Sequence, residues 1–434
     1  MIIIPLYFSF PKNSKIRGRQ AVKNVLYYNK VYPFDYAIQE GIPLKYWRGY
    51  ITAALFAALA WALSTFAQSH TKLIDAVYPY FSRLIQTSLA DWTASAPFCL
   101  WQLLLVVLGV GALASIVAVV VLRWNLFQWL GWILAICTFI CTLHVGVFGL
   151  NYYSGDLADD IRLETQERNI TDLVDATKYY LQQANDLADQ VPRKADGSVD
   201  YPTFSELANM AGEGFDTLVY DKYYAVFSGS TVPVKELGWA DMYSSMGITG
   251  FTMSLTGEAA VNPMIPAVAL PFTMCHEMCH RMCIAIERDA NMGAFLACDA
   301  NSDISFRYSG YFMAFRYCYN ALVSVGTATS ASAASEIYAG INANLLKDLN
   351  EYKEFFETNK DDKATDFANT VNDAYLKSNG DEEGVESYSN VSDLLVDWYI
   401  QEIYLPQHQE EVIVFDPTDK NQVDLSEGTE GNEE

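Results

Sequence analysis

The stretch LLLVVLGVGALASIVAVVVL, residues 103–122, contains no charged side chain and is long enough to cross a bilayer as a helix. A helix of this length in a soluble protein would normally keep a polar face, and this stretch has none. Apolar stretches of similar length lie on either side of it in the sequence. We therefore predict three membrane-spanning helices, at residues 50–67, 98–122 and 126–150.

Basic residues around these stretches predict their orientation, because cytoplasmic flanks of membrane helices are enriched in Lys and Arg. Residues 1–47 form a basic segment that is expected in the cytoplasm, as is the loop containing Arg123. No cleavable signal is expected, so the first span would serve as the anchor. An odd number of spans in the region 48–150 then places all later residues outside the cytoplasm. Basic residues before or at the start of the first span are Lys12, Lys15, Arg17, Arg19, Lys23, Lys30, Lys45 and Arg48.

Charge divides the chain into two unlike halves. Residues 1–150 hold 11 Lys and Arg against 4 Asp and Glu, whereas the remainder holds 17 against 48. An acidic domain of this kind repels phosphate backbones, and no basic stripe interleaved with aromatic residues is present, so nucleic-acid binding is excluded as a function class. A lipid bilayer is the partner that the composition favours; the oligomeric state is not predicted.

The acidic half is predicted to be mainly helical. Residues 151–190 repeat apolar residues at intervals of three and four, which indicates an amphipathic helix, and we interpret 151–200 as a stalk. A helical domain is expected over 201–415. Within it, residues 246–263 (MGITGFTMSLTGEAAVNP) have no helical period and predict a strand or hairpin beside the active site. The acidic tail, 416–434, is expected to be disordered.

Residues 276–280 read His-Glu-Met-Cys-His, and the whole chain has 5 histidines. Residues four apart on a helix lie one turn apart on the same face, so His276 and His280 can converge on one zinc ion. Glu277 would flank the open coordination site, take a proton from zinc-bound water and pass it to the departing amine. The neighbouring residues are apolar, and polar side chains in so apolar a helix require a reason such as metal ligation.

The third ligand constrains the geometry after this helix. Glu287 lies seven residues beyond His280, about 10 Å along a straight helix and out of reach of the same ion, so the helix must end between them. Many zinc peptidases have glycine at the position of Cys283, which allows the turn. We predict Glu287 as the third ligand, with Asp289 as the alternative. Asn291 would hydrogen-bond a ligand imidazole.

Several motifs resemble a family of uncharacterised bacterial membrane proteins, the domain-of-unknown-function family numbered 3810. The segments that carry the resemblance span most of the chain: TGEAAVN at 256–262, LPFTMCHEMCH at 270–280, ERDAN at 287–291, YSGYFMAFRY at 308–317 and YLKSNGDEEGVESY at 375–388. The resemblance implies a membrane-anchored zinc peptidase. The chain departs from the family pattern at Cys283, Arg288 and Asp289, where glycine, a second acid and Glu are usual. These departures leave the third ligand open.

Further site residues are expected from their positions in these motifs. Glu258 and Asn262, in an edge strand before the active helix, are predicted to bind a substrate backbone, with ordinary strand roles as the alternative. Tyr388 is predicted to donate a hydrogen bond to the oxyanion, with a packed structural tyrosine as the alternative.

The expected fold is mostly α: three N-terminal transmembrane helices, then a mainly helical, zincin-like extracytoplasmic domain with a small β element beside the active-site helix. The expected function is that of a membrane-anchored metallopeptidase with one Zn²⁺ ion, acting on peptides or proteins. Two alternatives stay open. The stretch 264–286 could form a fourth span of an intramembrane protease, or the chain could be an inactive, zinc-stabilised sensor or assembly protein.

Overall fold

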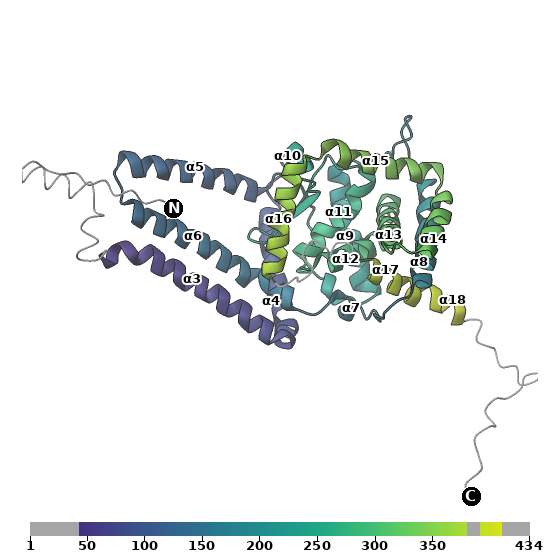
Figure 1. Ribbon diagram of the computed structural model, residues 1–434, viewed down its shortest axis with the longest axis horizontal. Coiled ribbons are helices and arrows are strands. Elements are labelled where there is room, and N and C mark those ends of the chain that lie inside the picture. The colour runs from purple at the N-terminus through teal and green to yellow at the C-terminus, as the bar shows by residue number, and fades with distance from the viewer. Residues whose placement is uncertain (1–42, 380–390, 410–434) are drawn as a thin grey trace, which may run out of the picture. The chain divides into compact units, whose positions relative to one another are not determined.

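The computed structural model describes residues 43–379 and 391–409 (Figure 1). Among these residues, three helices are long and apolar enough to cross a membrane: α3 (Leu44–Ser69), α5 (Leu100–Val121) and α6 (Leu126–Val147). The predicted number of apolar N-terminal helices is confirmed, with ends shifted by a few residues. Most of the basic segment 1–47, Tyr388 and the acidic tail lie outside the described residues.

The chain divides into two compact units. The first comprises residues 1–59 and 112–142. Within it, the ring of Tyr50 lies 4.6 Å from that of Phe127, and Thr142 Oγ1 donates a hydrogen bond to the carbonyl of Phe56 at 2.9 Å. The second unit comprises residues 60–111 and 143–434. Residues before position 112 therefore belong to the same unit as the acidic domain, a connection that the predicted boundary at residue 150 missed.

Helices form nearly all of the second unit, and their bounds follow chain order. They are α4 (Thr71–Thr93), η1 (Gly149–Tyr153), α7 (Leu157–Asp160), α8 (Ile170–Ala188), α9 (Phe204–Asp221), η2 (Ala225–Phe227), α10 (Ala240–Ser245), η3 (Ala267–Ala269), α11 (Leu270–Arg281), α12 (Glu287–Asp299), α13 (Ile304–Ser324), α14 (Ala328–Ala339), α15 (Ala343–Asn359), α16 (Asp362–Asn379), α17 (Val391–Trp398), the π-helical η5 (Tyr399–Tyr404) and α18 (Leu405–Gln409). The mainly helical prediction is confirmed.

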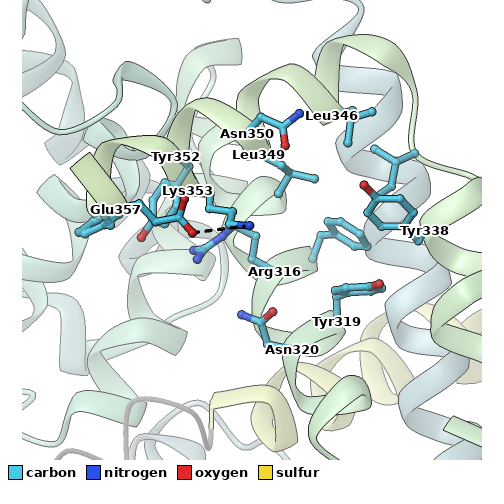
Figure 2. A pocket seen from close by; sticks show the side chains of 13 residues that line it. Arg316, Tyr319, Asn320, Tyr338, Leu346, Leu349, Asn350, Tyr352, Lys353 and Glu357 are labelled. Atoms are coloured by element: carbon cyan, nitrogen blue, oxygen red, sulfur yellow. Dashed lines mark ion pairs between the residues drawn. The ribbon is translucent and has the colours of Figure 1, made fainter. Parts of the chain in front are cut away.

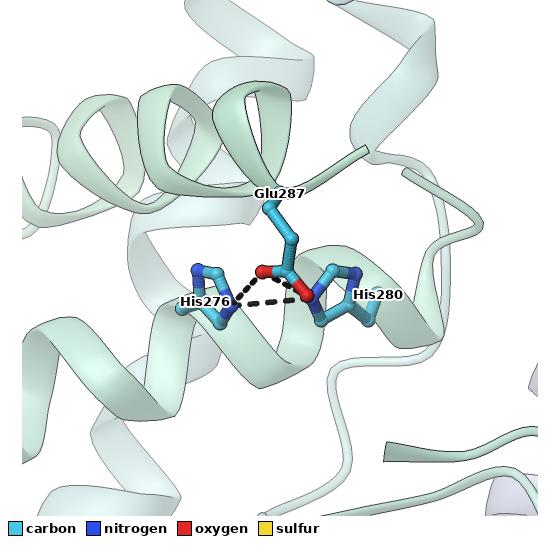
Figure 3. A group of neighbouring side chains, drawn as sticks. All are labelled: His276, His280 and Glu287. Atoms are coloured by element: carbon cyan, nitrogen blue, oxygen red, sulfur yellow. Dashed lines mark hydrogen bonds and ion pairs between the residues drawn. The ribbon is translucent and has the colours of Figure 1, made fainter. Parts of the chain in front are cut away.

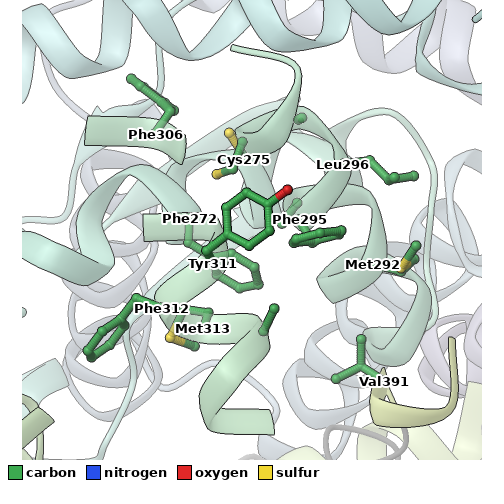
Figure 4. Close-up of a cluster of buried hydrophobic side chains, with 14 of the residues drawn as sticks. Phe272, Cys275, Met292, Phe295, Leu296, Phe306, Tyr311, Phe312, Met313 and Val391 are labelled. Atoms are coloured by element: carbon green, nitrogen blue, oxygen red, sulfur yellow. The ribbon is translucent and has the colours of Figure 1, made fainter. Parts of the chain in front are cut away.

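The hydrophobic core forms around α11, α12 and α13, which contact one another and are joined by α8 and α9 (Figure 1). Large apolar side chains such as Phe272, Phe295 and Phe312 fill it and are almost fully buried (Figure 4). Close approach of α11 and α12 depends on Gly293, because a Cβ there would collide with the thiol of Cys279. This packing fixes the two helices that carry the motif residues against each other.

Residues 151–190 do not form the predicted single helix and stalk. The regular helix α8 begins only at Ile170, where the Asn169 side chain caps it by accepting from the backbone N–H of Thr171 at 2.7 Å. Its apolar face then packs on α13, and Tyr180 on that face is completely buried. The periodicity correctly gave an apolar face, but that face belongs to the core of the domain.

A three-stranded sheet with the order β1-β3-β2 packs on α11. The strands are β1 (Lys235–Glu236), β2 (Gly250–Met253) and β3 (Glu258–Val261), and β2 and β3 form the predicted hairpin. Since β3 is the central strand, the prediction that Glu258 lies in an edge strand is wrong. The edge strand beside α11 is β2.

The alternative of a fourth span over 264–286 is also wrong. Helix α11 has 12 residues, about 18 Å in length, whereas a spanning helix needs about 20 residues. Its side chains are buried by protein, and the fully buried Arg281 donates to the carbonyls of Ser230 and Val232 at 3.0 and 2.6 Å. The apolar character of this stretch therefore reflects its place in the core.

Candidate metal centre

His276 and His280 lie one turn apart on α11 and point the same way (Figure 3). Their Nε2 atoms are 3.1 Å apart. Oε2 of Glu287 lies 3.2 Å from Nε2 of His276 and 3.4 Å from Nε2 of His280. Ligand atoms held about 2.0–2.1 Å from a zinc ion at tetrahedral angles lie about 3.3 Å from one another. The three side chains therefore have the spacing of three corners of a zinc tetrahedron.

Glu287 reaches the histidines because α11 ends at Arg281 and α12 begins at Glu287 itself. The reversal passes through Cys283, whose φ of +72° is a left-handed conformation that favours glycine. The predicted break is confirmed, and cysteine adopts the conformation that glycine would provide. A non-glycine residue in this region costs on the order of 1 kcal/mol or more.

Substitutions at Cys283 test this turn. We expect Cys283→Gly to leave the free energy of unfolding within about 1 kcal/mol of wild type, because relief of backbone strain offsets the loss of a small buried side chain. Cys283→Val places a β-branched residue at positive φ and is expected to cost at least about 2 kcal/mol more than Cys283→Gly. Thermal unfolding of the full-length protein in detergent measures both. Equal stability of the two variants would contradict a left-handed residue 283.

Hydrogen bonding orients the imidazole of His280. Its Nδ1 lies 2.8 Å from the carbonyl oxygen of Ile284, which can only accept, so Nδ1 carries the proton and Nε2 of the neutral ring offers its lone pair to the cluster. Burial lowers the pKa of His280, but the charge of Glu287 and the hydrogen bonds more than offset this and raise it to about 9. The same histidines hold the pKa of Glu287 well below its usual range despite its burial. The cluster thus attracts positive charge, supplied either by protons or by a metal cation.

Glu277 projects beside the cluster and is buried. Thr252 Oγ1, on strand β2, donates to Oε2 of Glu277 at 2.7 Å. Gly250, on the same strand, allows this approach because a Cβ there would collide with the Glu277 carboxylate. Burial raises the pKa of Glu277, partly countered by the two histidines. A carboxylate with a raised pKa, held in a fixed direction, is suited to accept and return a proton.

The other predicted ligand, Asp289, does not belong to the cluster. Its carboxylate accepts from the backbone N–H of Leu157 at 2.8 Å and from Nε of Arg288 at 3.0 Å. In the described chain, the group of potential metal ligands within 4.8 Å of one another consists of His276, His280 and Glu287. The alternative assignment of Asp289 is therefore wrong, because one residue pair along α12 turns the two carboxylates to different sides.

Asn291 does not take the predicted position beside an imidazole. Its Oδ1 accepts from the Tyr317 hydroxyl at 3.2 Å, and the Ile284 carbonyl takes the place beside His280. Nδ1 of His276 is buried and has no hydrogen-bond partner within the described ranges.

Glu258 and Asn262 are buried structural residues. Glu258 accepts from the first backbone N–H groups of α5, at Leu100 and Trp101, at 2.8 and 3.0 Å, and pairs with Lys235 Nζ at 2.6 Å. Nδ2 of Asn262 donates to Ser244 Oγ at 2.9 Å, and its Oδ1 accepts from the N–H of Met264 at 3.0 Å. The prediction of substrate contact is not supported at either residue, and the alternative of an ordinary strand role fits.

The model of a family described as "Protein of unknown function (DUF3810)" matches residues 74–396, which is more than half of the chain. The chain belongs to the DUF3810 family. The resemblance seen in the sequence motifs is thereby confirmed. No curated protein and no solved structure matches the chain. The DUF3810 match begins at Ile74 in α4 and includes the sheet and both helices that carry the cluster.

A larger cavity of about 610 Å³ lies elsewhere in the DUF3810 region, between α13, α14 and α15 (Figure 2). Aromatic side chains dominate its wall, and the guanidinium of Arg316 lies 3.8 Å from the centre of the Tyr352 ring. None of its lining residues belongs to the His276, His280 and Glu287 cluster. We place the candidate site at the cluster, because the side chains with suitable chemistry converge there.

Sequence reasoning missed Thr252 and Gly250, and it did not place His144. Nδ1 of His144, in the last turn of α6, lies 2.8 Å from Ser254 Oγ, and its Nε2 lies 3.2 Å from the Tyr375 hydroxyl on α16. His144 thus ties the end of an apolar helix to the β2–β3 turn and to α16. The apolar run around residue 251 was the available signal for a strand beside the motif, but nothing in it indicated which residue would face Glu277.

Proposed function

We propose that this protein is a membrane-anchored, zinc-dependent peptidase. The observation that carries the proposal is the convergence of His276 Nε2, His280 Nε2 and Glu287 Oε2 at tetrahedral spacing, with Glu277 buried beside them. Three protein ligands are the set typical of catalytic zinc, which keeps its fourth position for water or substrate. A structural site would instead be closed by a fourth protein ligand, and the cluster in the described residues has three members.

His276, His280 and Glu287 would hold the ion. Zinc in such a site supplies Lewis acidity, which makes a water molecule more acidic and polarises a peptide carbonyl. Glu277 accepts the proton of the attacking water and delivers it to the nitrogen of the departing amine. Thr252 keeps the Glu277 carboxylate aligned for both transfers through its hydrogen bond at 2.7 Å. An oxyanion donor role for Tyr388 remains a prediction.

Strand β2 offers a place for an extended peptide. It is the edge strand of the sheet on the side of α11, and Thr252 connects it directly to Glu277. An exposed strand edge can bind a peptide through main-chain hydrogen bonds, which are largely independent of sequence. The peptide bond to be cut would then lie along β2, beside the carboxylate.

The compartment belongs to the same proposal. The apolar helices α3, α5 and α6 would anchor the chain, and the basic residues near the first span and at Arg123 favour a cytoplasmic N-terminus. The catalytic unit would accordingly face the outside of the cell. Peptides, or secreted and wall-associated proteins, are the substrates that such a location offers.

Metal analysis of the purified protein is the test. The full-length chain in detergent is required, because residues 60–111 belong to the same compact unit as the cluster. We expect about one zinc ion per chain, and a large loss of zinc in His276→Ala, which removes a ligand. His408→Ala, at an exposed histidine on α18, is the matched control and should retain the metal. A folded wild-type protein that binds no zinc would reject the proposal.

A further inference from the structure

Helix α4 presents its apolar side outward and polar side chains inward. Ser82, Arg83, Gln86 and Thr93 are buried against the rest of the unit. The opposite face carries large apolar and aromatic side chains, each more than half exposed: Leu73, Val77, Tyr80, Phe81, Leu84 and Trp92. A surface helix of a soluble domain has the reverse arrangement. An apolar patch of this kind on a protein surface marks a contact with another phase or another molecule.

Specific hydrogen bonds fix this orientation. Arg83 Nε donates to the carbonyl of Met282 at 3.1 Å, and Gln86 Nε2 donates to that of Ser254 at 2.9 Å. Ser82 Oγ donates to the carbonyl of Val147 at 2.7 Å. Rotating α4 to bury its apolar face would break all three bonds and leave buried polar groups unpaired, at a cost of about 1–3 kcal/mol for each group. The apolar face is therefore held outward by the fold.

Both ends of α4 are tied to helices that can cross a membrane. Only His70 separates α3 from α4, and six residues, 94–99, separate α4 from α5. Six residues reach at most about 20 Å, whereas α4 itself is about 35 Å long. Two consecutive spans meet the bilayer surface on the same side, so both ends of α4 lie near that surface. The helix must then run along the surface.

We propose that α4 is an in-plane membrane helix whose outer face, Leu73, Val77, Tyr80, Phe81, Leu84 and Trp92, lies in the lipid interface. Tyr and Trp are the residues favoured at the boundary between acyl chains and water. Helices of this kind bury one apolar face about 5–10 Å into the boundary. α4 also carries Lys72, Asp75, Arg83 and Asp91, which a helix crossing the bilayer would not accommodate.

Lipid is a better occupant than a second protein chain because the outer face is continuous with surfaces that already require lipid. The residues just before and after α4 belong to α3 and α5, whose side chains are apolar on all sides. This inference rests on the proposal that α3 and α5 cross the bilayer, and it is independent of any peptidase activity.

The arrangement brings the candidate metal centre to the membrane. The inner face of α4 contacts the turn that joins the two ligand helices, through Arg83 and the Met282 carbonyl and through Ser82 Oγ, 3.2 Å from Cys283 Sγ. The cluster therefore lies directly behind a membrane-facing helix. Polypeptides attached to the membrane, or leaving it, would reach such a site more readily than soluble ones.

Site-specific labelling tests the position of α4. The full-length protein, with Cys137→Ser and Cys141→Ser to remove its two exposed thiols, is labelled with a fluorophore at Leu84→Cys or Val77→Cys and placed in phosphatidylcholine vesicles. Nitroxide attached to lipid headgroups quenches from the interface, and iodide quenches from water. Val110→Cys, exposed on α5, reports whether that helix lies in lipid, and Glu213→Cys, exposed on α9, is the water-facing control.

We expect labels at positions 84 and 77 to be quenched by the lipid nitroxide and protected several-fold from iodide relative to position 213. Iodide quenching equal to that at 213, with position 110 protected, would overturn the proposal for α4 while the membrane anchor stands. Protection from both quenchers would mean that protein covers the face, for example a second copy, and would also overturn it. Val77→Cys keeps the test valid if Leu84→Cys does not fold.

Discussion

Glu277→Gln is expected to lower kcat/KM for peptide hydrolysis by about 10²–10⁴-fold, the range typical of a removed general acid–base group. The amide has nearly the same shape as the carboxylate and can still accept the hydrogen bond from Thr252 Oγ1 through its oxygen. It cannot take a proton from water at neutral pH. Zinc content should stay at the wild-type level, because Glu277 is not one of the three clustered ligand side chains.

Two comparisons make this result specific. Glu213→Gln changes an exposed glutamate on α9 in the same chemical way and should leave both zinc and activity unchanged. A Glu277→Gln protein that keeps zinc and full activity would reject the role assigned to Glu277. If the wild type itself binds zinc but cleaves no peptide library, the alternative of an inactive, zinc-stabilised sensor or assembly protein is favoured.

Local sequence patterns predicted those features of the fold that depend on neighbouring residues. The uncharged stretch at 103–122 identified a membrane-length helix, and the His276–His280 spacing identified two imidazoles on one face. The need for Glu287 to reach the same point predicted the end of α11 before residue 287. Each of these inferences follows from helix geometry over a dozen residues or fewer.

Features that depend on distant residues were missed. Arg83 binds the carbonyl of Met282, 199 residues later, and no local pattern records that pairing. The loop containing α4 was therefore expected only to connect two spans. Glu258 was assigned to substrate because a carboxylate near the motif suggests chemistry, yet its partners are Lys235 and the start of α5. Amphipathicity likewise gave α8 an apolar face without naming α13 as the surface that covers it.

The choice between Glu287 and Asp289 illustrates the limit most clearly. Both acids lie in the first turn of α12, two positions apart, and both are buried. Consecutive helical residues differ by about 100° in direction, so two positions turn a side chain to the opposite side of the helix. Which of the two meets the histidines depends on where α12 begins, and that is set by the left-handed turn at Cys283.

Glu287→Gln should release the zinc ion. An amide carries no charge and binds zinc poorly, so the affinity should fall by more than the 10–100-fold typical of losing an outer-sphere partner. Asp289→Asn is the matched variant two residues away, and it should keep the metal because its carboxylate binds Leu157 N–H and Arg288. Chelator competition on the full-length protein in detergent measures both affinities.

Thermal unfolding provides an independent readout of the same prediction. A ligand at 100 times its Kd stabilises the folded state by about 2.7 kcal/mol, so zinc should raise the Tm of wild type and of Asp289→Asn. It should have little effect on Glu287→Gln. Asp289→Asn can lower the Tm in both conditions, because it weakens a buried hydrogen bond, but the shift caused by zinc should remain. A zinc-dependent shift that survives in Glu287→Gln and disappears in Asp289→Asn would assign the third ligand to Asp289 and contradict the geometry of the cluster.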